Sequence, residues 1–131
     1  MMNAMTGWQT EIEELHVTFE AYFLGTLDTL DRVEQALADD FTIVGPYGIE
    51  SSRAETMSAL RDAHGHTDSL EISVTDLVLL LETSECLVAR YVENHQLGEQ
   101  TNHRRSTAVF AKDDAAPNGL RWRRVHETWL G

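Results

Sequence analysis

The stretch Arg121-Trp122-Arg123-Arg124-Val125-His126-Glu127-Thr128-Trp129-Leu130 decides how the rest of the chain is interpreted. It combines aromatic, cationic and acidic side chains with β-branched residues, and it follows a turn that contains Pro117, Asn118 and Gly119. A segment of this composition is typical of a strand inside a sheet, where both faces are covered. We therefore predict a central or near-central strand, over residues 120–130, with one face lining a pocket.

Three more strands are predicted upstream of it. Residues 70–81, 86–96 and 103–112 alternate between apolar and polar side chains, which is the period of a half-buried strand. Short turns that contain Gly, Asn, Ser or Asp separate them, so neighbouring strands are expected to pair as antiparallel hairpins. The single cysteine, Cys86, lies inside this pattern and is predicted to be a buried thiol.

The first half of the chain has a helical period instead. An apolar stripe with steps of three and four residues predicts a first helix that ends at Gly25, with the acidic residues Glu11, Glu13, Glu14 and Glu20 off the stripe and in solvent. The stripe consists of Trp8, Ile12, Leu15, Phe19, Tyr22 and Phe23.

Two shorter helices are predicted after it. The second has Leu30, Val33 and Leu37 on its apolar face and ends at Asp39-Asp40, before a short strand at residues 41–44. The third begins at the capping box Ser52-Arg53-Ala54-Glu55 and runs to about residue 64.

The order of elements predicts an α+β fold in which helices cover one face of a bent sheet. The 131 residues are expected to form one domain, over residues 1–131. A net charge of −12 excludes most nucleic-acid partners, because phosphate binding needs a positive surface. With no long apolar run and no secretion signal in this sequence, we expect no membrane association and a cytoplasmic location.

Three stretches carry a family resemblance. They are Leu37–Thr42 with the turn Gly45–Gly48, the capped segment Ser52–Leu60, and the closing hairpin Arg105–Phe110 with Trp122–His126. Together they resemble the nuclear transport factor 2-like superfamily, in particular its SnoaL-like and calcium/calmodulin-dependent kinase association-domain-like members. The resemblance implies a cone-shaped, cystatin-like fold with three N-terminal helices on the concave face of a strongly bent, mainly antiparallel sheet. It does not imply one activity, because this superfamily holds enzymes and non-catalytic hubs.

Two departures from the family pattern bear on activity. The ketosteroid isomerase branch has a proton-shuttling Asp where this chain has Gly45, although Tyr22 lies close to the position of that branch's oxyanion-hole Tyr. A Tyr on an apolar stripe is also an ordinary core residue. The kinase hub has an Arg where this chain has Trp129, so its anion site is not carried over.

Matching the closing hairpin to the hub pattern assigns a face to each side chain. The set that includes Arg123, Val125, Glu127 and Trp129 is predicted to face the cavity, and the set Trp122, Arg124 and His126 the outer surface. A shift of one residue would exchange the two sets. The predicted ligand-binding residues are His16, Phe19, Tyr22, Phe23, Tyr91, Arg104, Phe110 and Trp129.

Two carboxylates beside one guanidinium are the candidate catalytic groups. We expect Arg104 to pair with Glu93 or Glu127, which would leave the other carboxylate desolvated and suited to general acid-base catalysis. Tyr91 or Arg104 would then stabilise the developing oxygen charge. The alternative is that these side chains form a structural network inside the sheet.

No cofactor and no metal are predicted. His95, His103 and His126 fall on different strands, without the short spacing typical of metal ligands. An outer face that carries Trp122, Thr107 and Val109 would be too apolar to stay exposed, so we expect a homodimer through it.

The sequence thus predicts a SnoaL-like domain that binds a small apolar ligand in a central cavity, with acid-base chemistry of the isomerase, cyclase or dehydratase type as its candidate activity. The alternative is a non-catalytic, dimeric module for ligand sensing or self-association.

Overall fold

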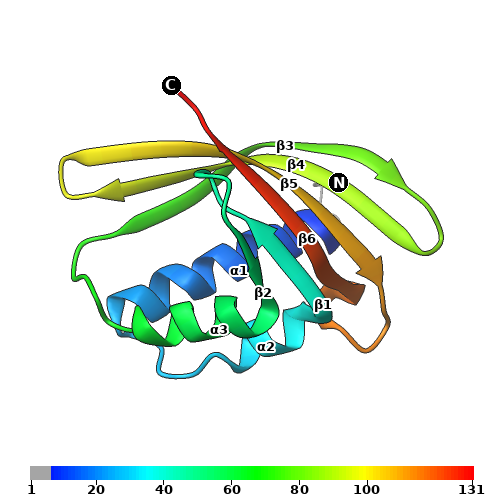
Figure 1. Ribbon diagram of the computed structural model, residues 1–131, viewed down its shortest axis with the longest axis horizontal. Coiled ribbons are helices and arrows are strands. Elements are labelled where there is room, and N and C mark those ends of the chain that lie inside the picture. The colour runs from blue at the N-terminus through cyan, green and yellow to red at the C-terminus, as the bar shows by residue number, and fades with distance from the viewer. Residues whose placement is uncertain (1–6) are drawn as a thin grey trace, which may run out of the picture.

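The computed structural model describes residues 7–131 and contains three α-helices, six strands and one 3-10 turn. Figure 1 shows the helices gathered on one side of a strongly curved sheet. The helices are α1 (Gly7–Leu24), α2 (Asp31–Ala36) and α3 (Arg53–Asp62), and the 3-10 turn is Pro117–Gly119. The strands are β1 (Leu37–Val44), β2 (Glu50–Ser52), β3 (Glu71–Glu82), β4 (Cys86–Leu97), β5 (Gln100–Lys112) and β6 (Leu120–Trp129).

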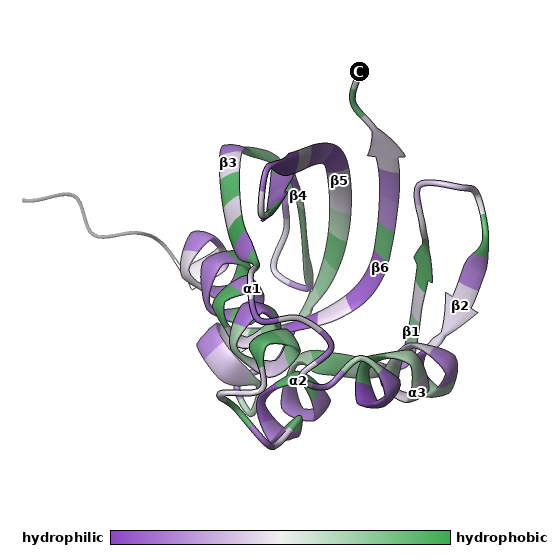
Figure 2. Ribbon diagram, turned by 90° about the vertical axis from the view of Figure 1, so that its left-hand side faces the viewer, coloured by the Kyte–Doolittle hydropathy of each residue, from purple (hydrophilic) through white to green (hydrophobic). Residues whose placement is uncertain are grey.

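All six strands belong to one sheet, in the order β2-β1-β6-β5-β4-β3. The pairs are antiparallel except for β1 and β6, which run parallel. The last strand is therefore an internal strand, as the sequence predicted. The α+β class and the cystatin-like, cone-shaped arrangement are confirmed, with the sheet curling over the helices in Figure 2.

Local sequence signals explain most element boundaries. Ser52 and Glu55 form the predicted capping box, in which the Ser52 hydroxyl accepts from the Glu55 amide and the Glu55 carboxylate accepts from the Ser52 amide. Gly25 has a φ of 80° just after α1, where a left-handed residue ends a helix at no steric cost.

The boundary between α2 and β1 was predicted wrongly. Leu37 is the first residue of β1 and not the last apolar residue of a helix, and the strand continues through Asp39 and Asp40 to Val44. Parallel pairing with β6, including Leu37 opposite Trp122, overrides the short helical pattern. The short edge strand β2 was not predicted either.

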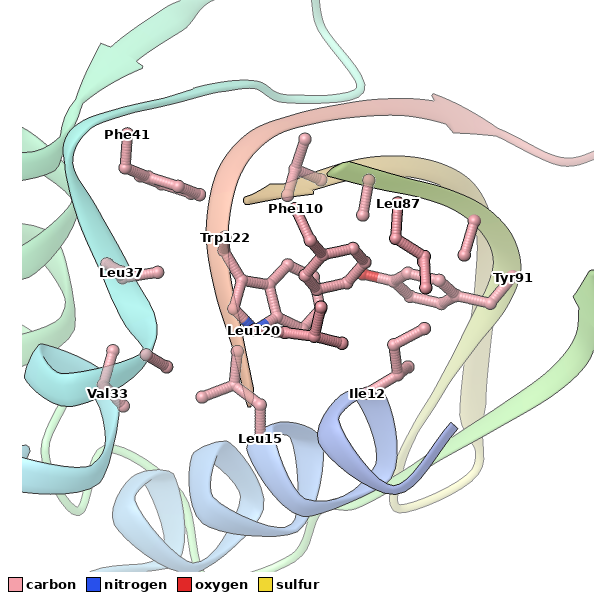
Figure 3. Packing of buried hydrophobic residues seen from close by; sticks show 14 of the residues in the cluster. Ile12, Leu15, Val33, Leu37, Phe41, Leu87, Tyr91, Phe110, Leu120 and Trp122 are labelled. Carbon is pink, nitrogen blue, oxygen red and sulfur yellow. The ribbon is translucent and has the colours of Figure 1, made fainter. Parts of the chain in front are cut away.

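The assignment of Trp122 to the outer face is also wrong. Val109 pairs with Arg124 but Phe110 pairs with Trp122, so a bulge at Arg123 inserts one extra residue into β6. Trp122 and Val125 are consequently both buried, while Arg123 and Arg124 are both exposed. In Figure 3, Trp122 points into the curve of the sheet beside Phe110, and the two rings lie 4.5 Å apart.

Trp122 and Phe110 belong to the main core, which lies between the sheet and α1. Figure 3 shows Ile12 and Leu15 rising from α1 toward Tyr91 on β4 and Trp122 on β6. Within residues 7–131, no helix combines the length and the apolar character needed to cross a bilayer.

Candidate functional site

A cavity of about 180 Å³ lies between the helices and the concave side of the sheet. Its wall is mostly apolar, with a few polar groups from α1, α3, β4 and β6. The lining residues are Leu15, His16, Phe19, Phe23, Val33, Leu37, Phe41, Ile43, Thr56, Leu60, Tyr91, Glu93, Trp122, Val125 and Glu127. An apolar cavity of roughly 150 Å³ accepts benzene, so this one suits a ligand of the size of a single ring.

Glu93 is held in the cavity wall by two histidines. One carboxylate oxygen lies 2.8 Å from His16 Nε2, and the other is hydrogen-bonded to His95 Nε2. His16 also donates from Nδ1 to the Ile12 carbonyl, at 2.7 Å. Because a carbonyl only accepts, His16 donates through both nitrogens when Glu93 is ionised, and the pair is an imidazolium with a carboxylate.

The ionisation of this pair follows from the same contacts. Burial alone would lower the pKa of His16, but the charge and hydrogen bond of Glu93 raise it above the usual value of 6.5. Burial would likewise raise the pKa of Glu93, but His16 and His95 together hold it well below the ordinary range of a carboxyl. Glu93 is therefore a fixed negative charge and does not exchange protons near neutral pH.

Glu127 lines the same cavity but is held loosely. Its two carboxylate oxygens lie 3.5 Å from Arg104 Nη1 and 3.5 Å from Ser106 Oγ, both at the outer limit of a hydrogen bond. Burial, and then the charge of Glu93, raise its pKa above 4.5, against the opposing effect of Arg104. Of the two candidate catalytic carboxylates, Glu127 is thus the one with an ionisation suited to proton exchange.

Tyr91 adds a hydroxyl to this region. Burial, followed by the charges of Glu93 and Glu127, raises the pKa of Tyr91 well above 10. The phenol therefore stays protonated and can donate a hydrogen bond. The expected pair between Arg104 and a carboxylate is a single contact of 3.5 Å to Glu127.

The structure brings six of the predicted residues together at the cavity and places four elsewhere. The six are His16, Phe19, Phe23, Tyr91, Glu93 and Glu127. Tyr22 is buried against His64, with 4.6 Å between ring centroids, and Phe110 is packed behind Trp122. Arg104 and Trp129 stack on each other at the far end of the sheet, beyond Glu127.

Glu11, predicted to be in solvent, is instead completely buried. Its carboxylate accepts from Arg32 Nη2 at 2.6 Å, from Asn118 Nδ2 at 2.9 Å and from Trp122 Nε1 at 2.9 Å. This network fixes the inward position of Trp122, which forms part of the cavity wall. No local pattern indicates this network, because the partners of Glu11 lie between 21 and 111 residues away in the sequence.

A metal site is not formed by the side chains seen in residues 7–131, where no group of three or more His, Cys, Asp or Glu has a suitable arrangement. Cys86 is half-buried and lies 3.4 Å from the Thr83 hydroxyl, so the predicted full burial of its thiol is not observed.

Comparison with known proteins places this architecture in a family. The model for the sucrose-6-phosphate phosphohydrolase C-terminal family matches residues 10–131. The chain belongs to this family. Sucrose-phosphatase 1 of Nicotiana tabacum is 24% identical over 127 residues, which cover 92% of the chain. The chain spans only 30% of the length of that relative.

Solved structures confirm that this member of the family has the nuclear transport factor 2-like fold. An NTF2-like protein of unknown function from Pseudomonas aeruginosa has a TM-score of 0.88 and 26% identity, covering 95% of this chain and 99% of that one. The CaMKII hub of S. rosetta has a TM-score of 0.77 and 14% identity, covering 99% and 100% of the two chains. A CaMKII association domain from Thiobacillus denitrificans has a TM-score of 0.73 and 17% identity, covering 99% and 100%.

Proposed function

We propose that this domain binds a small, mainly apolar molecule in the cavity and that Glu127 is the group that exchanges a hydrogen bond or a proton with it. The observation that carries the proposal is the difference between the two carboxylates. Glu93 has both oxygens in short contacts, whereas Glu127 has only two contacts of 3.5 Å in an apolar wall. A buried carboxylate without close partners gains free energy when a ligand donates to it.

The chemistry at Glu127 follows from its surroundings. A carboxyl with a raised pKa is a better proton donor and acceptor near neutral pH than an ordinary one. Tyr91, which stays protonated, supplies a nearby hydroxyl that is suited to stabilise negative charge on a ligand oxygen. These features support acid-base chemistry of the isomerase, cyclase or dehydratase type, with Glu93 as a fixed charge.

The size of the cavity limits the ligand. A volume of about 180 Å³ with mainly apolar walls supports a single-ring molecule with one polar group. A disaccharide phosphate needs more space and a polar partner for each hydroxyl, so the activity in the name of the Nicotiana relative is not part of the proposal.

Phenol tests this proposal, because its ring fits the cavity and its hydroxyl can donate to Glu127. Titration followed by amide NMR is expected to shift resonances around the cavity, and Glu127→Gln is expected to weaken phenol binding roughly tenfold through loss of a charged acceptor. Glu99→Gln, an equal charge change in an exposed turn, is the matched control and should leave the affinity unchanged.

Filling the cavity is the second arm of the experiment. Leu60 lines the cavity from α3 and is only partly buried, so Leu60→Phe should reduce the space without disturbing the main core. Loss of phenol binding in this variant is expected. Equal binding to wild type, Glu127→Gln and Leu60→Phe would contradict the proposal.

Self-association is a second candidate function, supported by an exposed apolar segment. Val78, Leu79, Leu80 and Leu81 are consecutive on the edge strand β3 and are each between 38% and 53% exposed. With Trp122 inside the protein, this segment replaces the outer sheet face as the apolar surface most suited to a homodimer contact. Proteins described as CaMKII hub and association domains share the fold, which adds support to an assembly role.

A further inference from the structure

Unpartnered polar atoms are concentrated at the end of the sheet where β5 meets the end of β6. In residues 7–131, four enclosed side-chain nitrogen or oxygen atoms have no hydrogen-bond partner, and three of them belong to Asn102, Arg104 and Trp129. Arg104 and Trp129 are directly opposite each other on the two strands. An enclosed polar atom without a hydrogen-bond partner destabilises the folded state, so a cluster of such atoms indicates a missing partner.

The chemistry of that partner can be read from the atoms. Arg104 Nε and Trp129 Nε1 are N–H donors, and one of them carries a positive charge. The third atom is Asn102 Oδ1, and exchanging the amide oxygen and nitrogen of this side chain would turn it into another donor. A guanidinium donor and an indole donor side by side match an acceptor with more than one oxygen and a negative charge.

Arg104 is available for such a group. Among residues 7–131 its one ion pair is the 3.5 Å contact with Glu127, and its guanidinium carbon lies 4.7 Å from the centre of the Trp129 ring. Stacking on an indole orients a guanidinium while leaving its edge free for hydrogen bonds. Arg104 is therefore positioned by Trp129 and is not neutralised by a close carboxylate.

This end of the sheet also lies between an outer hollow and the cavity. The hollow is lined by Tyr47, Thr101, Asn102, His103 and Trp129 together with the last two residues. On the inner side, Arg104 contacts Glu127, which lines the cavity. A ligand that binds Arg104 would thus have its remaining atoms beside Glu127.

We propose that Arg104, Trp129 and Asn102 form an oxyanion subsite, which binds the carboxylate or phosphate group of a small ligand whose apolar body enters the cavity. The position of the body rests on the function proposed above, while recognition of the anion does not. The three polar atoms are covered in this conformation, so side chains at this end must shift on binding. Tyr47, which is 81% exposed and packs edge-on against Trp129, is the group most free to move.

Benzoate is the probe for this subsite, with neutral benzamide as its comparison. Isothermal titration is expected to give tighter binding for benzoate, and Arg104→Gln is expected to weaken it roughly tenfold or more. Arg105→Gln is the matched control, because it removes the same charge from the next residue, which is exposed on the opposite face of β5. Its affinity for benzoate should stay within about twofold of wild type, as a surface charge contributes little.

Further variants keep the test informative if Arg104→Gln folds poorly. Arg104→Lys keeps the positive charge but loses the planar guanidinium, and Trp129→Phe keeps an aromatic ring but loses the N–H. Each variant should lower the affinity for benzoate several-fold while the circular dichroism spectrum stays unchanged. Phenyl phosphate and inorganic phosphate, titrated separately, distinguish a phosphate site from a carboxylate site.

The outcomes separate the two proposals. Equal affinity for benzoate and benzamide, or equal losses in Arg104→Gln and Arg105→Gln, would overturn the oxyanion subsite, and enclosed water would then satisfy these donors. Phenol binding without benzoate binding would overturn the subsite alone. Binding of benzoate that depends on Arg104, without any binding of phenol, would support the subsite and contradict the function proposed for Glu127.

Discussion

Glu93 and Glu127 face the same cavity, yet their neighbours give them opposite properties. Glu93 is paired with His16 and His95, and its pKa lies well below the ordinary range. Glu127 has only long contacts, and burial raises its pKa. The charged neighbours of each carboxylate, and not strand position alone, therefore decide how it ionises.

Replacement of each carboxylate by its amide should separate these properties. Glu93→Gln leaves His16 without its charged partner and is expected to cost about 3 kcal/mol of unfolding free energy at pH 6. Glu127→Gln removes a poorly paired charge and should be neutral or slightly stabilising at the same pH. Urea unfolding measures both, and equal losses in the two variants would contradict the assignment.

The pH dependence of stability should differ in the same way. Ionised Glu93 stabilises the folded state above pH 4.5, and protonated His16 does so below pH 6.5, so their pair contributes most between these values. Glu127 behaves in the opposite way to Glu93. Its pKa is raised in the folded state, so its ionisation above pH 4.5 lowers the free energy of unfolding. The free energy of unfolding of Glu127→Gln, relative to that of wild type, should therefore increase from pH 4.5 to pH 7.

Part of the cavity wall could be predicted by strand alternation once the family resemblance had assigned the inner face. Tyr91 and Glu93 on β4 line the cavity as expected, because β4 and β5 pair without a bulge. The ionisation of Glu93 was not predictable, since His16 lies 77 residues away on a helix.

At the scale of elements, Glu11 connects α1 to three other parts of the chain. Arg32 lies at the start of α2, Asn118 in the 3-10 turn and Trp122 on β6, and all three donate to this carboxylate. The 0% exposure of Glu11 means that these hydrogen bonds replace its contact with water completely.

Glu11→Gln should destabilise the protein by about 2–3 kcal/mol, because an amide has one acceptor oxygen and would place its own N–H₂ against other donors. Glu14→Gln is the matched control. Glu14 also contacts Arg32 and Asn118, at 3.2 Å and 2.9 Å, but its side chain is 52% exposed. Thermal unfolding that is equally affected in both variants would show that the buried network contributes nothing beyond a surface ion pair.

Element boundaries were predictable where a local motif exists and not where pairing decides. The capping box located the start of α3, and the turn residues located the three hairpins that join β3 to β6. The bulge at Arg123 was missed, because one extra residue reverses the faces of a strand without changing its composition. The adjacent exposed residues Arg123 and Arg124 are the only local sign of it.

At the scale of the whole molecule, charge and apolar surface give different expectations for assembly. A net charge of −12 opposes the approach of two copies, whereas Val78–Leu81 on β3 favours it. Glu20 covers part of the same edge by accepting from the Ile72 amide at 2.7 Å, so the apolar half of β3 is the half open to a partner.

Light scattering coupled to size exclusion tests the assembly. We expect wild type to form a dimer that is favoured by higher salt, and Leu80→Lys to shift it toward monomer. Val17→Lys, at a residue that is 65% exposed on α1, is the control for an added charge elsewhere. A monomeric wild type at every concentration and salt would refute self-association.

The position of β6 has a consequence for how the chain acquires its structure. Because β6 lies between β1 and β5, the sheet consists of two separate ribbons, β2-β1 and β5-β4-β3, until residues 120–129 are inserted. Each ribbon then exposes an unpaired inner edge that can bind other nascent chains. Closure also requires Leu37 to meet Trp122, a contact between distant parts of the sequence that slows folding. Translation that pauses before Leu120 should therefore leave an intermediate that depends on chaperones and is prone to aggregation.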